Sequence, residues 1–194
     1  MHQLSGLNEK RFFIECIADR DDEDSFDFLT QAIRKETDVR LIKSLLKAMT
    51  EFKSNKFAPY ISDFLYSDDK ELVALAVEAL GACSTDLAID AIINRAGADT
   101  SLDKLIVKTL KKIASEKTLS ALVEFLGSNI SSLRNGARQA LAELKEVSIP
   151  HLLDTLKSKN SNLVIAALEA GIQDYLHKPF NKSGIEMVLK RYLK

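Results

Sequence analysis

The chain has 194 residues, of which 46% are hydrophobic and 28% are charged, and its formal net charge is −1. This composition is too apolar for a disordered chain, and the balanced charge gives no overall attraction to nucleic acid or to an anionic membrane. The first residues lack the basic and apolar regions of a secretory signal, and no apolar run is long enough to cross a bilayer. We therefore expect a cytoplasmic protein that binds neither nucleic acid nor a membrane.

Apolar residues recur along most of the chain at the 3.6-residue spacing of a helix rather than at the alternate spacing of a strand. In chain order, this pattern predicts helices at 7–20, 26–35, 39–52, 57–66, 71–82, 85–95, 102–114, 117–126, 132–144, 149–157, 162–170 and 184–193. Pro59 and Pro150 fall at the start of two of these helices, where a missing N–H costs little. Gly81, Gly127 and Gly171 fall near helix ends, where a left-handed residue is often needed. The pattern predicts six helix pairs.

A longer pattern returns about every thirty residues. Its clearest copies begin at Leu72, Leu102, Leu133 and Leu163, and a looser copy begins at Val39. A fixed period in this range is typical of a solenoid, in which each helix pair buries its apolar face against its neighbours.

The repeat pattern is clearest in the L-x-x-x-A-x-x-A-L cores at 72–80 and 133–141, and in the second-helix sequence I-P-H-L-L-D-T-L at 149–156. They resemble the HEAT-like repeat family in its short form, which bilin lyases share. The resemblance covers about residues 7 to 171 and implies an all-α, right-handed α–α superhelix with first helices on the convex side and second helices lining a concave groove. We expect a single domain over 1–194, with an atypical capping segment at 172–194. Most members of this family bind proteins, and a minority are enzymes or bind DNA.

Aligned on their last core residue, the second helices place an acidic residue at one position in four repeats: Asp63, Asp90, Glu124 and Asp154. Two interpretations remain open. The four carboxylates form a column in the concave groove that binds a basic segment or helix of another protein, or they are the solvated face of amphipathic helices. Tyr60 and His151 occupy one equivalent position beside the acids and complete the predicted binding surface.

No motif indicates catalysis, a metal or a cofactor. The three histidines are widely spaced, and the acidic run at 19–24 fits a calcium loop poorly, so capping of the next helix is the better interpretation. Cys16 and Cys83 both fall in apolar helical settings and are expected to be buried thiols. We expect no enzyme activity, no metal and no cofactor.

The end of the chain departs from the repeat. Residues 167–180 read A-L-E-A-G-I-Q-D-Y-L-H-K-P-F and resemble the end of a response-regulator receiver domain, in which the residue matching Lys178 contacts a phosphoryl group. The aspartate that would accept the phosphoryl group is missing from the chain. The resemblance suggests either a fused fragment or a terminal repeat that converged on the same pattern.

The sequence thus favours a non-enzymatic scaffold that binds a protein in the concave groove of a HEAT-like array. The alternatives are an adaptor in two-component signalling and, less favoured, a lyase-type or DNA-repair enzyme.

Overall fold

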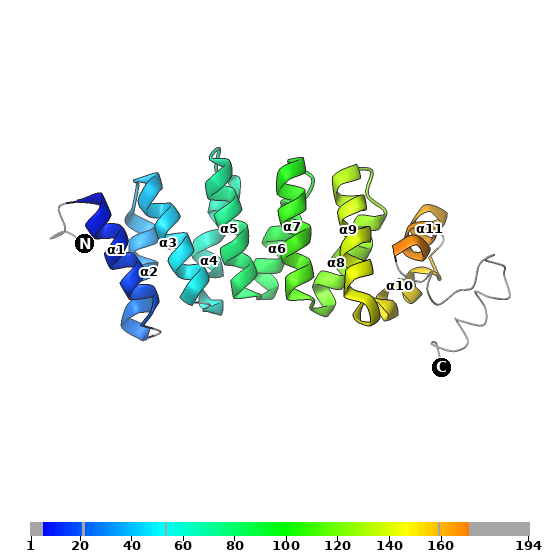
Figure 1. The fold of residues 1–194 in the computed structure, drawn as a ribbon, viewed down its shortest axis with the longest axis horizontal. Helices are drawn as coiled ribbons and strands as arrows, with labels where there is room; N and C mark the ends of the chain where they lie inside the picture. Colours follow the sequence, from blue (N-terminus) through cyan, green and yellow to red (C-terminus); the bar gives the residue numbers. More distant parts are fainter. Residues whose placement is uncertain (1–5, 21, 53, 159, 171–194) are drawn as a thin grey trace. The chain divides into compact units, whose positions relative to one another are not determined.

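The computed structural model describes residues 6–20, 22–52, 54–158 and 160–170, and these residues form helices and no strand (Figure 1). The chain divides into two compact units, Met1–Arg95 and Ala96–Lys194, and each is described by itself. The prediction of an all-α chain built from helix pairs is confirmed. The predicted helix at 184–193 and the receiver-like segment after Ala170 lie outside the described residues.

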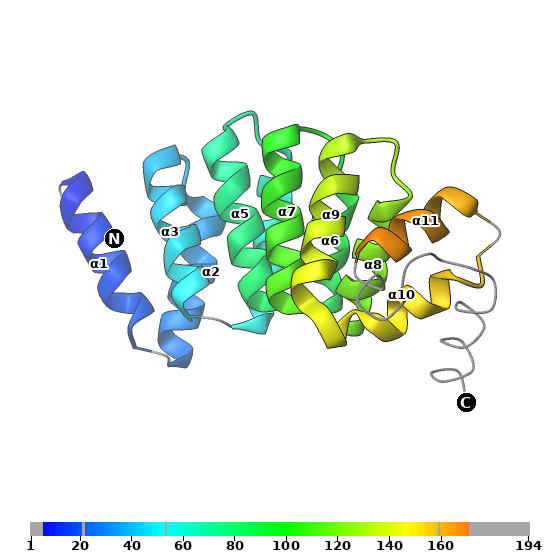
Figure 2. The same ribbon diagram turned by 45° about the vertical axis from the view of Figure 1, so that its right-hand side comes forward.

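The first unit consists of three helix pairs. Its elements are α1 (Leu7–Ala18), α2 (Glu23–Lys35), α3 (Val39–Phe52), the 3-10 turn η1 (Asn55–Phe57), α4 (Ala58–Ile61), the 3-10 turn η2 (Ser62–Tyr66), α5 (Lys70–Cys83) and α6 (Asp86–Asn94). The first helices of the pairs, α1, α3 and α5, lie side by side, and the second helices α2, α4 and α6 form a parallel layer (Figures 1 and 2).

The second unit repeats this arrangement. Its elements are α7 (Thr100–Ile113), α8 (Glu116–Leu126), α9 (Ser131–Leu144), the 3-10 turn η3 (Lys145–Val147), α10 (Ile149–Thr155) and α11 (Ser161–Ala170). The helices α7 and α9 pack against each other, α9 packs against α11, and α8 packs against α10 (Figure 2).

Small side chains at the helix contacts explain this close packing. Ala76 and Ala79 in α5, and Ala137 and Ala140 in α9, are almost completely buried. Gly136 in α9 faces Val107 in α7, and a Cβ atom built at Gly136 would lie 3.4 Å from the nearest Val107 methyl carbon. The repeated alanines and glycine therefore bring neighbouring first helices close enough for the leucine and isoleucine side chains to fill the space between them.

The segment predicted as one helix at 57–66 consists of three short elements. It begins with η1, continues as α4 with Pro59 in its first turn, and tightens into η2 after Ile61. The Ser62 hydroxyl donates to the Ala58 carbonyl oxygen at 2.8 Å, a back-bond that is known to bend helices. The apolar residues still point inward, since Phe57, Ile61 and Leu65 are fully buried.

Helix ends differ from the prediction in one respect. Ser84 after α5 and Ala114 after α7 adopt the left-handed conformation, with φ values of 52° and 50°. Gly81 lies inside α5, and Gly127 ends α8 with a right-handed φ of −85°, so the predicted role of these two glycines is wrong. The helix α5 runs one residue past its predicted end, because Cys83 still contributes to the core.

Candidate functional site

The four acidic positions predicted from the repeat are all exposed. Asp63 lies on η2 and Asp90 on α6, and these two elements pack against each other in the first unit. In the second unit, Glu124 lies on α8 and Asp154 on α10, which are also neighbours. The structure thus places the acids as one pair on adjacent elements in each unit. The column of all four extends over both units and stays a prediction.

Asp154 already forms an ion pair within its own chain. The Lys157 ammonium lies 2.8 Å from the Asp154 carboxylate, one turn along the chain. The hydrogen bond from Lys157 lowers the pKa of Asp154, and the charge of Lys157 and that of nearby His151 add to this effect. A basic partner at this position would have to compete with Lys157, whose ion pair is exposed and hence weak.

The two residues predicted beside the acids are half-buried. His151 lies on α10, one turn before Asp154. Tyr60 lies on α4, and the Arg34 guanidinium sits over its ring at 4.5 Å from the centroid. Tyr60 is therefore already in contact with a cation of its own chain.

A groove that the sequence did not predict lies between α7 and α9, wholly within the second unit. It encloses about 490 Å³, which falls in the range of roughly 300–1,000 Å³ typical of ligand pockets. Its charged lining consists of three lysines and one glutamate: Lys104, Lys108, Lys111 and Glu143. Its neutral lining consists of Thr100, Val107, Ser131, Ser132, Asn135, Gly136, Gln139 and Ala140.

Within this groove only one lysine is neutralised by the described residues. Lys111 forms an ion pair with Glu143, and this contact lowers the pKa of Glu143, with a further contribution from Gln139. Lys104 and Lys108 are exposed and make no ion pair or hydrogen bond with the described part of the chain. The sequence alone does not show that these lysines border a groove, because the groove is formed by the packing of α7 against α9.

A buried carboxylate binds Ser132, one of the residues that line the groove. Asp103 on α7 is 1% exposed, and its Oδ1 accepts a hydrogen bond from the Gly97 N–H at 2.7 Å. Its other oxygen accepts from the hydroxyl of Ser132 on α9. Asp103 thus joins the loop before α7 to the first turn of α9. The repeat alignment offered a signal, because Asp103 holds the place that the buried Val73 holds in α5.

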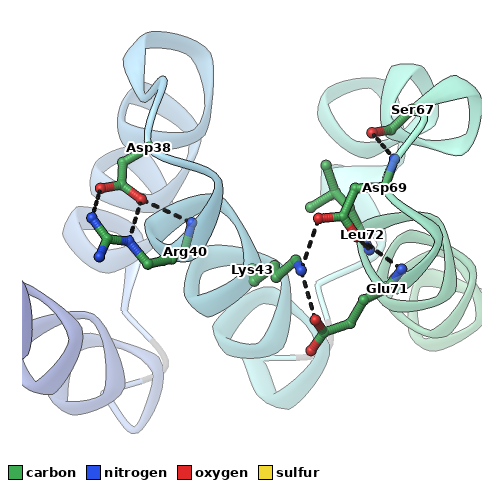
Figure 3. Close-up of polar contacts among 7 residues, drawn as sticks. All are labelled: Asp38, Arg40, Lys43, Ser67, Asp69, Glu71 and Leu72. Atoms are coloured by element: carbon green, nitrogen blue, oxygen red, sulfur yellow. Dashed lines mark hydrogen bonds and ion pairs between the residues drawn. The ribbon is translucent and has the colours of Figure 1, made fainter.

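In the first unit, ion pairs join α3 to the start of α5 at the equivalent helix contact (Figure 3). Lys43 on α3 lies 2.8 Å from Asp69 and 2.6 Å from Glu71 at the start of α5. Asp69 also accepts hydrogen bonds from the backbone N–H groups of Glu71 and Leu72, and the contact with Lys43 is the largest cause that lowers its pKa. The network joins neighbouring repeats and neutralises Lys43.

The acidic run at 19–24 lies at the start of α2. Asp22 caps α2 through the Ser25 N–H at 2.7 Å, which confirms capping as the role of the acidic run.

Cys83 is buried, and burial raises the pKa of its thiol to about 11. Cys16 is exposed, so its predicted burial is wrong: α1 is the first described helix and turns this residue to solvent. The described residues contain no cluster of histidine, cysteine and carboxylate side chains able to hold a metal.

Comparison with known proteins supports the fold. The chain is similar to a chain of the complex of CpcE and CpcF of phycocyanin lyase from Nostoc sp. PCC7120, with 15% identity, a TM-score of 0.56, and coverage of 98% of this chain and 90% of that chain. The chain has a HEAT-like helical-repeat fold. A designed armadillo repeat protein in complex with the peptide (KR)4 matches at 16% identity and a TM-score of 0.44, over 84% of this chain and 91% of that chain. An engineered protein matches at 19% identity and a TM-score of 0.46, over 88% of this chain and 57% of that chain.

No protein-family model matches the chain, and no curated protein is significantly similar to it in sequence. The receiver-like ending therefore gains no support as a receiver domain. No helix among the described residues is long and apolar enough to cross a membrane.

The likeness to phycocyanin lyase corrects one prediction. The expectation that the chain is not an enzyme came from its repeat fold and its lack of a catalytic motif. It is overturned because a chain with the same fold belongs to a lyase. One fold can therefore serve both binding proteins and enzymes.

Proposed function

We propose that the chain is a helical-repeat scaffold that binds a basic segment of another protein along its second helices. The observation that carries this proposal is the exposure of all four aligned acids, Asp63, Asp90, Glu124 and Asp154, in pairs on neighbouring elements. Repeated positions on one layer of a solenoid are a common means of recognising an extended partner, and opposite charge raises the rate and specificity of association. Tyr60 and His151 would contact the same segment.

The test uses a fluorescein-labelled peptide of alternating Lys and Ser residues, whose binding is followed by fluorescence anisotropy at low salt. The variant Asp63→Lys/Asp90→Lys should bind this peptide about fivefold to thirtyfold more weakly than wild type, because it loses two surface ion pairs of about 0.5–1 kcal/mol each. Adding Glu124→Lys and Asp154→Lys should abolish binding.

A matched control is available in the first unit. Glu51 on α3 and Glu78 on α5 are exposed acids on first helices, so Glu51→Lys/Glu78→Lys makes the same change in net charge on the other layer. The control variant should keep most of the affinity. An equal loss in both variants would show that the peptide senses only net charge, and the assignment to the second helices would fail.

A second candidate function is a lyase-type role, favoured by the likeness to the phycocyanin lyase chain. The assay incubates the protein with apo-phycocyanin and free bilin chromophore, with and without added CpcE or CpcF. Fluorescence of the phycocyanin band on a denaturing gel would report covalent attachment. Fluorescence no greater than in the protein-free reaction, under every combination, would rule out this activity.

A further inference from the structure

We infer that the α7/α9 groove is a second docking surface, specific for an acidic segment of a protein partner and separate from the acidic surface on the second helices. The inference starts from a comparison of two equivalent lysines. Lys43 is the fifth residue of α3 and Lys104 is the fifth residue of α7, and each faces the start of the next first helix.

The two lysines meet opposite surroundings. At the start of α5, Asp69 and Glu71 both bind Lys43 within 2.8 Å (Figure 3). At the start of α9, the residue before the helix is Ile130 and the first turn carries no acidic residue. The acids that neutralise the lysine in the first unit therefore have no counterpart around Lys104.

The groove as a whole carries an excess of positive charge. Three lysines line it against one glutamate, and that glutamate already pairs with Lys111. Lys104 and Lys108 are left without a counterion from the described residues, on the wall of a 490 Å³ groove. A carboxylate arriving in the groove would find two ammonium groups on one wall and the side-chain amide of Asn135 on the other as a hydrogen-bond donor.

The spacing of the lysines fits an extended acidic chain. Lys104 and Lys108 are four residues apart on one helix, which corresponds to a rise of about 6 Å. Alternate side chains of an extended peptide point the same way and are separated by about 6.6 Å. A segment with acidic residues at every second position would place successive carboxylates opposite successive lysines along the groove. Such a segment is the occupant to which we commit.

The experiment measures the anisotropy of a fluorescein-labelled peptide of alternating Glu and Ser residues in the presence of the full chain. Wild type should bind it, and Lys104→Glu/Lys108→Glu should weaken binding about tenfold or more, because two attractions become repulsions. Raising the salt from 0.1 M to 1 M shortens the screening length from about 10 Å to about 3 Å and should release the peptide.

Two single variants separate the groove from general charge. Lys108→Glu should weaken binding severalfold, whereas Lys112→Glu, an exposed change on the same helix outside the groove lining, should have a much smaller effect. Equal effects of these two variants, or no binding by wild type, would overturn the inference. It would also be overturned if duplex DNA bound more tightly than the peptide and the same two lysines carried that binding. Because the Lys–Ser peptide reports on the second helices, loss of one activity with retention of the other distinguishes the two proposals.

Discussion

The buried carboxylate of Asp103 gives the most quantitative test of the packing between α7 and α9. It accepts two hydrogen bonds, from the Gly97 N–H and the Ser132 hydroxyl. A hydrogen bond to a charged group contributes about 1.5–3 kcal/mol, so Asp103→Ala should lower the free energy of unfolding by about 3–6 kcal/mol. This is a large share of the roughly 5–15 kcal/mol that holds a typical native state together.

Two companion variants show where the loss comes from. Asp103→Asn keeps an acceptor for the Gly97 N–H and offers an amide N–H to the Ser132 oxygen, so it should cost much less than Asp103→Ala. Ser132→Ala removes one of the two bonds and should cost an intermediate amount. In the double variant the two costs should not add, since both substitutions remove the same hydrogen bond.

Urea unfolding followed by far-UV circular dichroism measures these free energies. The reasoning would be refuted if Asp103→Ala changed the free energy of unfolding by less than about 0.5 kcal/mol, which is the range of ordinary surface substitutions. It would also be refuted if Asp103→Asn and Asp103→Ala cost the same, because the loss would then come from the charge rather than from the hydrogen bonds.

Three further predictions concern helix ends, thiols and pH. Ala114→Gly should stabilise the fold by about 0.5–1 kcal/mol because glycine adopts the left-handed φ of 50° without strain. Ala74→Gly, inside α5, should destabilise the fold by about 1 kcal/mol. Equal shifts of the thermal melting temperature in the two variants would contradict this. Ellman's reagent at pH 8 should modify the exposed Cys16 rapidly. The buried Cys83, whose thiol has a pKa of about 11, should react only after unfolding. Rapid reaction of two thiols in the native protein would be inconsistent with the burial of Cys83. The pKa of Asp38, measured by carboxyl NMR, should be about 2 because Arg40 binds the carboxylate. The stability that Asp38 contributes is therefore present above pH 4 and lost as the pH falls towards 2. A titration midpoint of Asp38 near pH 3.8 would contradict this prediction.

The fold could be predicted from the sequence because its main signals are local. The 3.6-residue spacing of apolar residues locates each helix, and the recurring alanines mark the close contacts between repeats. Helix boundaries were harder to predict. The helix predicted to begin at residue 102 begins at Thr100, because the Asp99 side chain caps it by accepting hydrogen bonds from the N–H groups of Ser101 and Leu102.

The candidate sites could be predicted only in part, because they depend on contacts between helices. The exposure of Asp63 and Asp90 follows from helical periodicity alone. The lysine-lined groove required the packing of α7 against α9, which shows that Lys104 lacks the acids that surround Lys43. The sequence pattern shows charged residues on both helices but not which of them face each other.

The central claim is that the acids on the second helices contact a partner protein. Carbodiimide labelling of carboxylates, with mass spectrometry of the protein free and in complex with a partner captured from its native cells, tests this claim directly. We predict that Asp63, Asp90, Glu124 and Asp154 lose most of their labelling in the complex, whereas Glu78 on the first helix α5 keeps its own. Unchanged labelling of the four acids, or protection of Glu78 instead, would contradict the claim.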